Sequence, residues 1–298
     1  MARQSIVAAV KAGRILVSDG AWGTFLQKKG MQPGECPELW CVTRRNDVMD
    51  IARGYIEAGS DMIETDSFGG TRCKLAHFGL ADRTAELNQA AAAISREAAG
   101  PDKWVIASVG PTGMMTAMGD VTEADFYAFF KEQVVALEAG GADAICIETM
   151  SALDESVAAI RAARENTGCE VICTLTYERT RQGTYRTMMG VSPTEAARAT
   201  VEAGAHIIGT NCGNGMDRML EIVRELKLAA PTTPIMVQAN AGLPKNENGV
   251  DVFPETPSDM AARVAELVAS GAVIIGGCCG TTPAHIAALK QAVNRLKS

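Results

Sequence analysis

The stretch VASGAVIIGGCC (residues 268–279) contains, in order, the end of an Ala-rich segment, a glycine, a β-branched run and a pair of cysteines. Three other stretches follow the same order: EAGSDMIETD (57–66), EAGGADAICIET (138–149) and EAGAHIIGTNC (202–212). A glycine after an amphipathic segment is typical of a helix C-terminus, and a short apolar run is typical of a strand buried on both faces. Each stretch therefore predicts a helix, a turn and a buried strand that ends at polar residues.

Four further apolar runs complete the set of predicted strands: RILVSDG (14–20), WVIASVGP (104–111), EVICTLTYE (170–178) and TPIMVQANAG (233–242). Segments of helical length separate the runs, at residues 47–58, 84–98, 123–139, 153–166, 193–203, 216–227, 257–270 and 283–296. Alternating strands and helices predict a parallel sheet, and eight such units in 298 residues favour a (β/α)8 barrel over a doubly wound sheet. No G-x-G-x-x-G follows a strand, which argues against a dinucleotide-binding fold. We expect an α/β protein with a single TIM-type barrel domain over residues 1–298.

The composition is that of an ordinary globular protein, with 47% hydrophobic and 21% charged residues. The net charge of −7 and the lack of a basic run argue against nucleic acid or an anionic membrane surface as a partner. No apolar stretch approaches the length of a transmembrane helix, and the N-terminal apolar stretch is too short and interrupted for a signal peptide. We therefore expect a cytoplasmic protein.

In barrels of this kind, the residues that perform chemistry lie where the strands end, at one mouth. The candidates at predicted strand ends are Asp19, Asp66, Glu148, Cys212, Asn240, Cys278 and Cys279. Neighbouring residues of a strand point to opposite faces, but a turn flanked by glycines can direct both Cys278 and Cys279 at one point. A metal site, a redox pair and chemically inert thiols are the three interpretations. Adjacent cysteines form only a strained disulfide, which argues against the redox pair.

Three cysteines that converge on one mouth suit Zn²⁺, and a weak fourth ligand, the side-chain oxygen of Asn240, would be displaced by substrate. Thiolate ligands make zinc a weak Lewis acid, so such a site suits thiol activation better than hydrolysis. Metal coordination deprotonates a thiol whose ordinary pKa is about 8.5. The sequence therefore predicts a zinc site for thiol alkylation.

The chain also resembles the homocysteine S-methyltransferases, including the homocysteine-binding module of cobalamin-dependent methionine synthases. The motifs that carry this resemblance are SDGAWGT (18–24), GPTG (110–113), IET (147–149), GTNCG (209–213), NAG (240–242) and GGCCGTTPAHI (276–286). The resemblance implies that Cys212, Cys278 and Cys279 hold zinc, which activates the homocysteine sulfur. It also implies that Asp19 and Glu148 lie near the substrate ammonium, and that amides of the turn from Gly20 to Thr24 hold the substrate carboxylate.

Two departures from the family motifs bear on which acceptor amine and which methyl donor are accepted. Asp66 and Ser67 stand where methionine synthases usually have Asn-Thr, so that Asp66 adds a charge at the mouth and is a candidate substrate contact. Met188 and Met189 stand in RQGTYRTMMGVSP (181–193), where smaller or polar residues are expected; they either widen an apolar surface for the donor or pack.

The closest similarity of GGCCGTTPAHI is to the cobalamin-linked branch, which favours methylcobalamin as the donor. The chain has no D-x-H-x-x-G motif for cobalamin and no room for a corrinoid module, so we expect a separate corrinoid protein as the partner. The alternatives are S-methylmethionine or a betaine-type donor, a different acceptor thiol, and a zinc or amino-acid binding protein without turnover. For single residues, Asp19 could instead cap its turn, and Asn240 could be a turn residue before Gly242.

Overall fold

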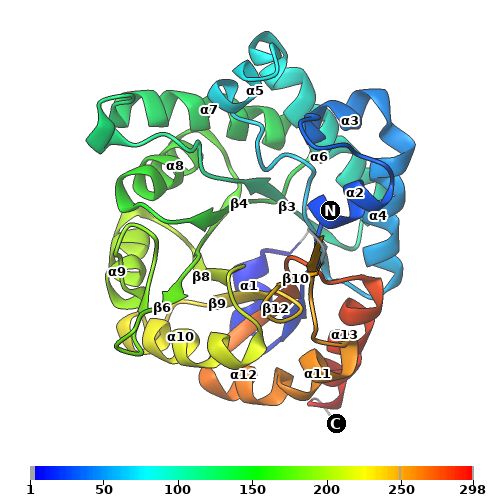
Figure 1. Cartoon of the computed structure of the whole chain (residues 1–298), viewed down its shortest axis with the longest axis vertical. Helices are drawn as coiled ribbons and strands as arrows, with labels where there is room; N and C mark the ends of the chain where they lie inside the picture. The colour runs from blue at the N-terminus through cyan, green and yellow to red at the C-terminus, as the bar shows by residue number, and fades with distance from the viewer. Residues whose placement is uncertain (1–3, 248–249, 297–298) are drawn as a thin grey trace.

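The computed structural model describes residues 4–247 and 250–296, and its centre is a parallel sheet of eight strands surrounded by helices (Figure 1). The strands are β1 (Leu16–Val17), β2 (Met62–Ile63), β3 (Trp104–Val109), β4 (Ala144–Met150), β5 (Glu170–Leu175), β8 (Ile207–Asn211), β9 (Ile235–Ala239) and β12 (Ala272–Gly277). They neighbour one another in the order β1-β12-β9-β8-β5-β4-β3-β2, which follows the chain around a ring. This confirms the predicted (β/α)8 barrel.

The helices on the outside of the barrel are α4 (Arg45–Glu57), α6 (Thr84–Ala99), α7 (Glu123–Ala139), α8 (Leu153–Asn166), α9 (Pro193–Ala203), α10 (Met216–Ala229), α11 (Pro257–Ala262), α12 (Val264–Ser270) and α13 (Pro283–Arg295). They match the eight predicted helical segments, except that the segment 257–270 is divided at Arg263. Thr122, Ser192 and Thr256 begin α7, α9 and α11 with reciprocal capping boxes, which satisfy the free amides of a helix N-terminus.

The glycines of the repeated stretches end helices, as the sequence predicted. Gly59, Gly141, Gly204 and Gly271 have φ angles of 101°, 103°, 108° and 114°. A residue with a Cβ rarely adopts this left-handed conformation, so glycine is required to turn each helix directly into the next strand.

The ring closes between β1 and β2 through side chains as well as backbone. The amide of Asp61 donates to the carbonyl of Val17 (2.7 Å), and the Asp61 carboxylate accepts from the Val17 amide (2.9 Å). Further toward the mouth, the Glu64 amide donates to the Asp19 carboxylate (2.9 Å). Lys290 of α13 holds the Asp61 carboxylate from outside (2.6 Å). The carboxylates of Asp61 and Asp19 therefore form hydrogen bonds between β1 and β2 that supplement the backbone bonds of these two short strands.

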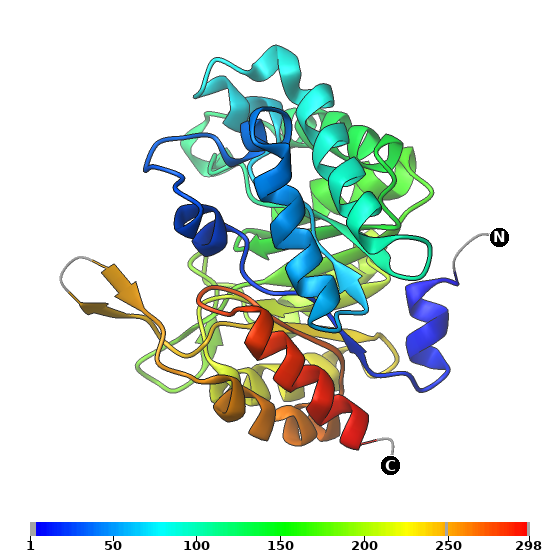
Figure 2. The ribbon, with the colours of Figure 1, turned by 90° about the vertical axis from the view of Figure 1, so that its right-hand side faces the viewer.

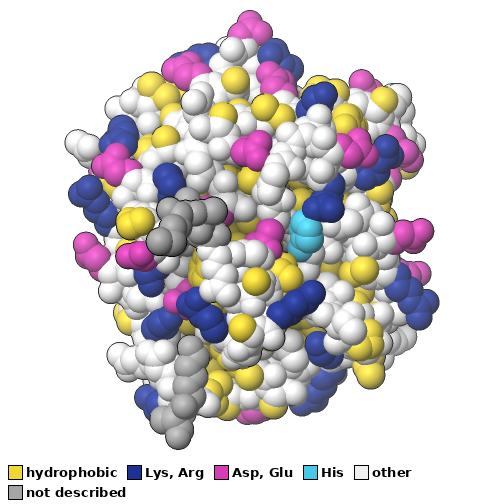
Figure 3. Space-filling model, turned by 180° about the vertical axis from the view of Figure 1, so that it is seen from behind, with side chains coloured by type: hydrophobic (Ala, Val, Ile, Leu, Met, Phe, Trp, Pro, Cys, Tyr) yellow, Lys and Arg dark blue, Asp and Glu magenta, His cyan; other side chains and the backbone are white. Residues whose placement is uncertain are grey.

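The interior of the barrel is apolar at one end and polar at the other. Helix α1 (Ile6–Lys11), which the sequence analysis did not predict, covers the apolar end and packs on a buried cluster that includes Leu16, Met62, Ile106 and Cys146 (Figure 2). The outer face of this end, shown in Figure 3, carries scattered charges of both signs. The polar end is the mouth formed by the carboxyl ends of the strands.

Further elements that the sequence analysis did not predict surround the mouth. They are the helices α2 (Gly23–Lys28), α3 (Pro37–Thr43) and α5 (Arg72–Ala76), and two hairpins, β6 (Glu178–Arg179) with β7 (Tyr185–Arg186) and β10 (Lys245–Glu247) with β11 (Val250–Val252). The β10–β11 hairpin projects from this end of the barrel in Figure 2. Within residues 4–247 and 250–296, no helix combines the length and apolar character needed to cross a membrane.

Candidate active site at the barrel mouth

A cavity of about 460 Å³ opens at the mouth, within the usual size range of small-ligand sites. Of the residues singled out from the sequence, Gly20, Thr24, Asp66, Glu148, Cys212, Cys278 and Cys279 line it. Asp19 and Asn240 do not line the cavity but lie directly beneath its surface, 0% and 3% exposed. Met188 and Met189 do not line it either, and Met188 is 82% exposed to solvent.

The three cysteines meet because β9 holds both of the turns that carry them. The Cys212 amide donates to the carbonyl of Gln238 (3.0 Å), and the Cys278 amide donates to the carbonyl of Ala239 (2.7 Å). Cys212 itself has a φ of 58°, a left-handed conformation that is unusual for a residue with a side chain. The backbone thus directs thiols from β8 and β12, far apart in sequence, to one point.

The sulfur atoms of Cys212, Cys278 and Cys279 lie within 4.8 Å of one another, and those of Cys212 and Cys279 are 3.8 Å apart. Among the described residues, this is the one group of three or more His, Cys, Asp or Glu side chains packed so closely. Hydrogen bonds from Cys278 and Cys279 lower the pKa of the Cys212 thiol, and the contact with Cys212 raises the pKa of the other two. The cluster therefore favours one negative charge as it stands and suits a soft divalent cation.

Asn240 lies beside this cluster. Its side chain helps to lower the pKa of the Cys212 thiol, and its Oδ1 is buried without a hydrogen-bond donor in the part of the chain that the structure describes. A buried oxygen without a donor is rare in proteins and is compatible with a metal ligand. The donor set thus fits the zinc ion that the sequence predicted.

Glu148, at the end of β4, is buried and accepts hydrogen bonds from the Ser108 hydroxyl and from Asn211 Nδ2 (3.2 Å). Burial raises its pKa to about 7. Asp19 accepts hydrogen bonds from the Trp22 indole (2.9 Å) and the Glu64 amide (2.9 Å), and burial raises its pKa to about 6. Burial thus disfavours the charged form of both carboxyl groups, and a bound cation would favour their ionisation.

Glu64 is a third buried carboxyl group at the mouth, together with Asp19 and Glu148, and was missed in the sequence analysis. It lines the cavity, is 6% exposed and accepts a hydrogen bond from Gln238 Nε2 (2.7 Å). A signal was present, because the tripeptide Ile-Glu-Thr occurs both at 63–65 and at 147–149. Ser108, Asn211 and Gln238 were missed as well. Ser108 and Gln238 are single polar residues in apolar runs, and Asn211 lies in GTNCG (209–213), of which only Cys212 was singled out.

The cavity is also lined by another pair of buried acidic residues, Glu38 and Asp66, which are 2% and 5% exposed. The carboxylate of Asp66 accepts a weak hydrogen bond from the Cys41 thiol (3.8 Å), and burial followed by the charge of Glu38 raises its pKa well above the usual range. Lys74, Phe68 and Phe78 line the same part of the cavity.

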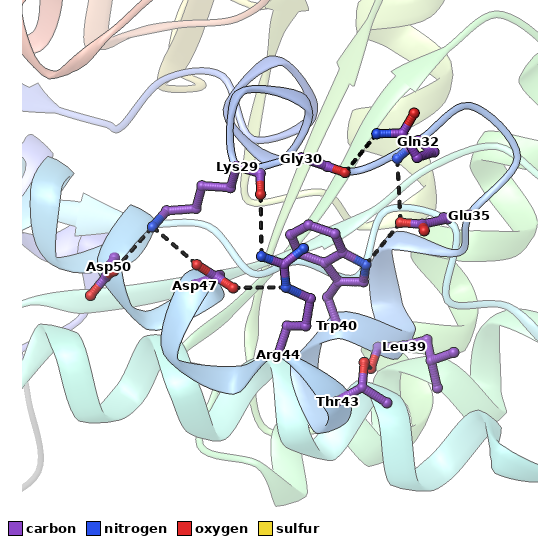
Figure 4. Close-up of polar contacts among 10 residues, drawn as sticks. All are labelled: Lys29, Gly30, Gln32, Glu35, Leu39, Trp40, Thr43, Arg44, Asp47 and Asp50. Atoms are coloured by element: carbon purple, nitrogen blue, oxygen red, sulfur yellow. Dashed lines mark hydrogen bonds and ion pairs between the residues drawn. The ribbon is translucent and has the colours of Figure 1, made fainter.

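Helix α3 brings Glu38 to this wall, and a surface network holds the segment in place (Figure 4). The Arg44 guanidinium stacks 3.9 Å from the centre of the Trp40 ring and donates to the carbonyl of Lys29 (3.2 Å) and to Asp47 (2.8 Å). The Trp40 indole donates to Glu35 (3.2 Å). The long connection between β1 and α4 is therefore fixed against the barrel.

Comparisons with known proteins agree with this architecture. The family profile described as "Homocysteine S-methyltransferase" matches residues 16–293. The methionine synthase of Mycobacterium tuberculosis (strain ATCC 25618 / H37Rv) is 35% identical over 97% of this chain and 25% of that protein. The methionine synthase of Mycobacterium leprae (strain TN) is 34% identical over 95% of this chain and 25% of that protein. The chain thus spans about a quarter of the length of these relatives.

Among solved structures, the homocysteine methyltransferase MmuM from Escherichia coli shares the fold. Its metallated form has a TM-score of 0.78 and 23% identity, and the match covers 95% of this chain and 98% of that one. Its oxidized form has a TM-score of 0.79 and 24% identity, over 97% and 99%.

Proposed function

Since this chain belongs to the homocysteine S-methyltransferase family and is therefore an S-methyltransferase, we propose that it methylates the sulfur of homocysteine to give methionine. The observation that carries the proposal is that one cavity contains both a cluster of three thiols and two buried carboxyl groups, Glu64 and Glu148, that form no ion pair with a Lys, Arg or His in the described part of the chain. The first suits the binding of a thiol, and the second suits the ammonium group of an amino acid. The whole of residues 1–298 is proposed to form this homocysteine-binding barrel.

Cys212, Cys278 and Cys279 would hold a zinc ion, with Asn240 Oδ1 as a weak fourth ligand. When bound, zinc supplies one effect, which is to lower the pKa of the acceptor thiol so that it is nucleophilic at neutral pH. Glu148 and Asp19 are proposed to act on the ammonium group of the acceptor. Backbone amides from Gly20 to Thr24 are proposed to hold its carboxylate.

The reaction conserves atoms and charge. The acceptor thiol loses its proton, and a lone pair on its sulfur forms the new bond to the methyl carbon. The bond between that carbon and the donor breaks, and its electron pair stays with the donor. The cavity walls keep the acceptor sulfur and the methyl carbon in contact and exclude water, which accelerates a displacement of this kind.

For the donor we propose methylcobalamin carried by a corrinoid protein, because GGCCGTTPAHI (276–286) is closest to the cobalamin-linked branch of the family. A second donor class, small sulfonium or ammonium compounds such as S-methylmethionine or betaine, is favoured by a specific observation. Glu38 and Asp66 are buried acidic residues that line the same cavity as the aromatic side chains of Trp22 and Phe68, and a cavity lined by acidic and aromatic groups suits onium groups. Methylation of homocysteine with S-methylmethionine alone would select the second class.

Zinc X-ray absorption of the purified protein, with and without homocysteine, tests the proposed site. Three sulfur neighbours that increase to four on addition of homocysteine are the expected result. Three sulfur neighbours that do not change would retain the metal site and point to a different thiol. Protein that binds no zinc, after reducing purification with zinc supplied, would contradict the proposal.

A further inference from the structure

Two turns that the proposed function uses lie next to each other at the mouth, one after β1 and one after β12. β1 and β12 are neighbouring parallel strands, and the Gly277 amide donates to the carbonyl of Asp19 (2.8 Å). Residues 20–24 of the first turn, and Cys278 and Cys279 of the second, line the same cavity. The spacing of the two turns therefore fixes how far the proposed carboxylate contacts lie from the proposed zinc ligands.

One buried hydroxyl, that of Thr281, is bonded to both turns. It accepts a hydrogen bond from the Ala21 amide (3.1 Å) and donates one to the Cys278 carbonyl (2.8 Å). A hydroxyl can donate one hydrogen bond and accept others, so both bonds form at the same time. Thr281 is 1% exposed and does not line the cavity, so it can act on a ligand only through the turns that it joins.

Thr281 also packs tightly against both turns. A Cβ on Gly20 would lie 2.5 Å from the Thr281 hydroxyl oxygen, and a Cβ on Gly277 would lie 2.7 Å from the Thr281 Cβ. Glycine is thus needed in both turns for this close approach. The neighbouring Thr282, and not Thr281, is the N-cap residue of α13. Helix capping therefore does not account for the buried Thr281 hydroxyl.

Ala21 is held at its carbonyl as well as at its amide. Tyr55 of α4, which is fully buried, donates from its hydroxyl to the Ala21 carbonyl (2.6 Å). The first turn therefore cannot shift at Ala21 without breaking a bond to Thr281 or to Tyr55. Leaving a buried backbone group without a partner is costly, so these two bonds hold the turn in one position.

We propose that Thr281 is a positioning residue which, together with Tyr55, holds the turn of residues 20–24 at the distance from Cys278 and Cys279 that lets one amino-acid thiol reach both. This inference rests on the proposed function, which assigns the acceptor carboxylate to the first turn and the acceptor sulfur to the cysteine cluster. Loss of the Thr281 hydroxyl should therefore weaken the contact with the carboxylate and not the binding of a thiol as such.

The test compares homocysteine with 3-aminopropanethiol, which is the same molecule without its carboxylate, by calorimetric titration of the zinc-loaded protein. The wild type is expected to bind homocysteine about tenfold or more tightly, because hydrogen bonds to a charged carboxylate contribute this much. Thr281→Val keeps the shape of the side chain but leaves the Ala21 amide without its acceptor, and it should reduce the preference about tenfold. Thr281→Ser keeps the hydroxyl and should retain the preference.

Thr282→Val is the matched control, because it removes a hydroxyl from the next residue and loosens the start of α13. Its Tm should fall, while its preference for homocysteine should stay that of the wild type. A loss of preference in Thr282→Val as large as in Thr281→Val would overturn the inference, since a general loosening of this segment would then explain both results.

Tyr55→Phe is a second variant, in a different element, and it decides the question if Thr281→Val does not fold. It removes the donor to the Ala21 carbonyl and should reduce the preference in the same direction. If the variant weakens both thiols by the same factor, or leaves both affinities unchanged, the inference is wrong and the proposed function stands. If the zinc-loaded wild type shows no preference for homocysteine, or binds neither thiol, the proposed function fails at this site and the inference fails with it.

Discussion

Removal of the Asp61 carboxylate tests how the barrel is closed between β1 and β2. In Asp61→Ala the Val17 amide loses its acceptor, and a buried donor left unpaired costs about 1–3 kcal/mol. Lys290 loses both of its bonds to Asp61, but its side chain is 22% exposed and regains water, so the cost is below the ~3–5 kcal/mol of a fully buried pair. We expect a loss of roughly 2–4 kcal/mol in the free energy of unfolding. Asp61→Asn keeps an acceptor for the Val17 amide and should lose only about 1 kcal/mol.

Urea denaturation followed by circular dichroism measures both variants against the wild type. For a chain of this size each kcal/mol corresponds to about 2–4 °C in Tm, so thermal scans should rank the variants in the same order. Equal losses in the Ala and Asn variants would show that the hydrogen bond to the Val17 amide is not what the carboxylate provides. A loss below about 0.5 kcal/mol in Asp61→Ala, typical of a surface change, would refute the idea that this side chain closes the ring.

Three further predictions concern the mouth. Cys212→Ser should weaken zinc binding by about a hundredfold or more, measured by competition with a chelating dye, whereas Cys73→Ser, outside the cluster, should leave the affinity unchanged. Gly277→Ala should destabilise the protein by about 1–3 kcal/mol, because the new Cβ would lie 2.7 Å from Thr281 Cβ. The control is Gly54→Ala in α4, which should be neutral or stabilising because its Cβ would make an ordinary 3.6 Å contact. The third prediction concerns Asp19, whose pKa is raised from 3.8 to about 6 in the folded state. Its protonation therefore favours the folded state below pH 3.8, and this stabilisation is lost as the pH rises through about 6. The free energy of unfolding should thus fall more steeply between about pH 4 and 7 in the wild type than in Asp19→Asn. Parallel pH profiles for the two proteins would contradict this last prediction.

The glycines explain why the fold could be predicted from the sequence. A glycine stands at each point where a helix turns back into a strand, at Gly59, Gly141, Gly204 and Gly271. Their left-handed φ values show that the backbone requires glycine at these positions. The strands that follow these glycines are continuous apolar runs because both of their faces are buried. Such a run can be recognised in the sequence without knowledge of distant contacts. The helices α2 and α3 of the β1–α4 connection, and α5 after β2, were missed because they are five to seven residues long and carry too few turns for a periodic pattern.

The cysteines could also be identified from the sequence, since barrel topology alone brings the ends of β8 and β12 to one mouth. Their convergence within 4.8 Å depends on β9, which bonds to both turns. Whether the cluster holds zinc stays a prediction until the metal is measured.

By itself the sequence determined the barrel, the family and the three thiols, because each depends on a short pattern of residue types. Only the tertiary structure decided which carboxyl groups face the cavity. Asp19 and Glu64 both follow apolar runs, yet Asp19 is enclosed by Trp22 and Ser18, while Glu64 lines the cavity beside Glu148. The physical reason is that hydrogen-bond partners come from several strands at once, so the side chains left free to bind a ligand depend on how those strands meet in space.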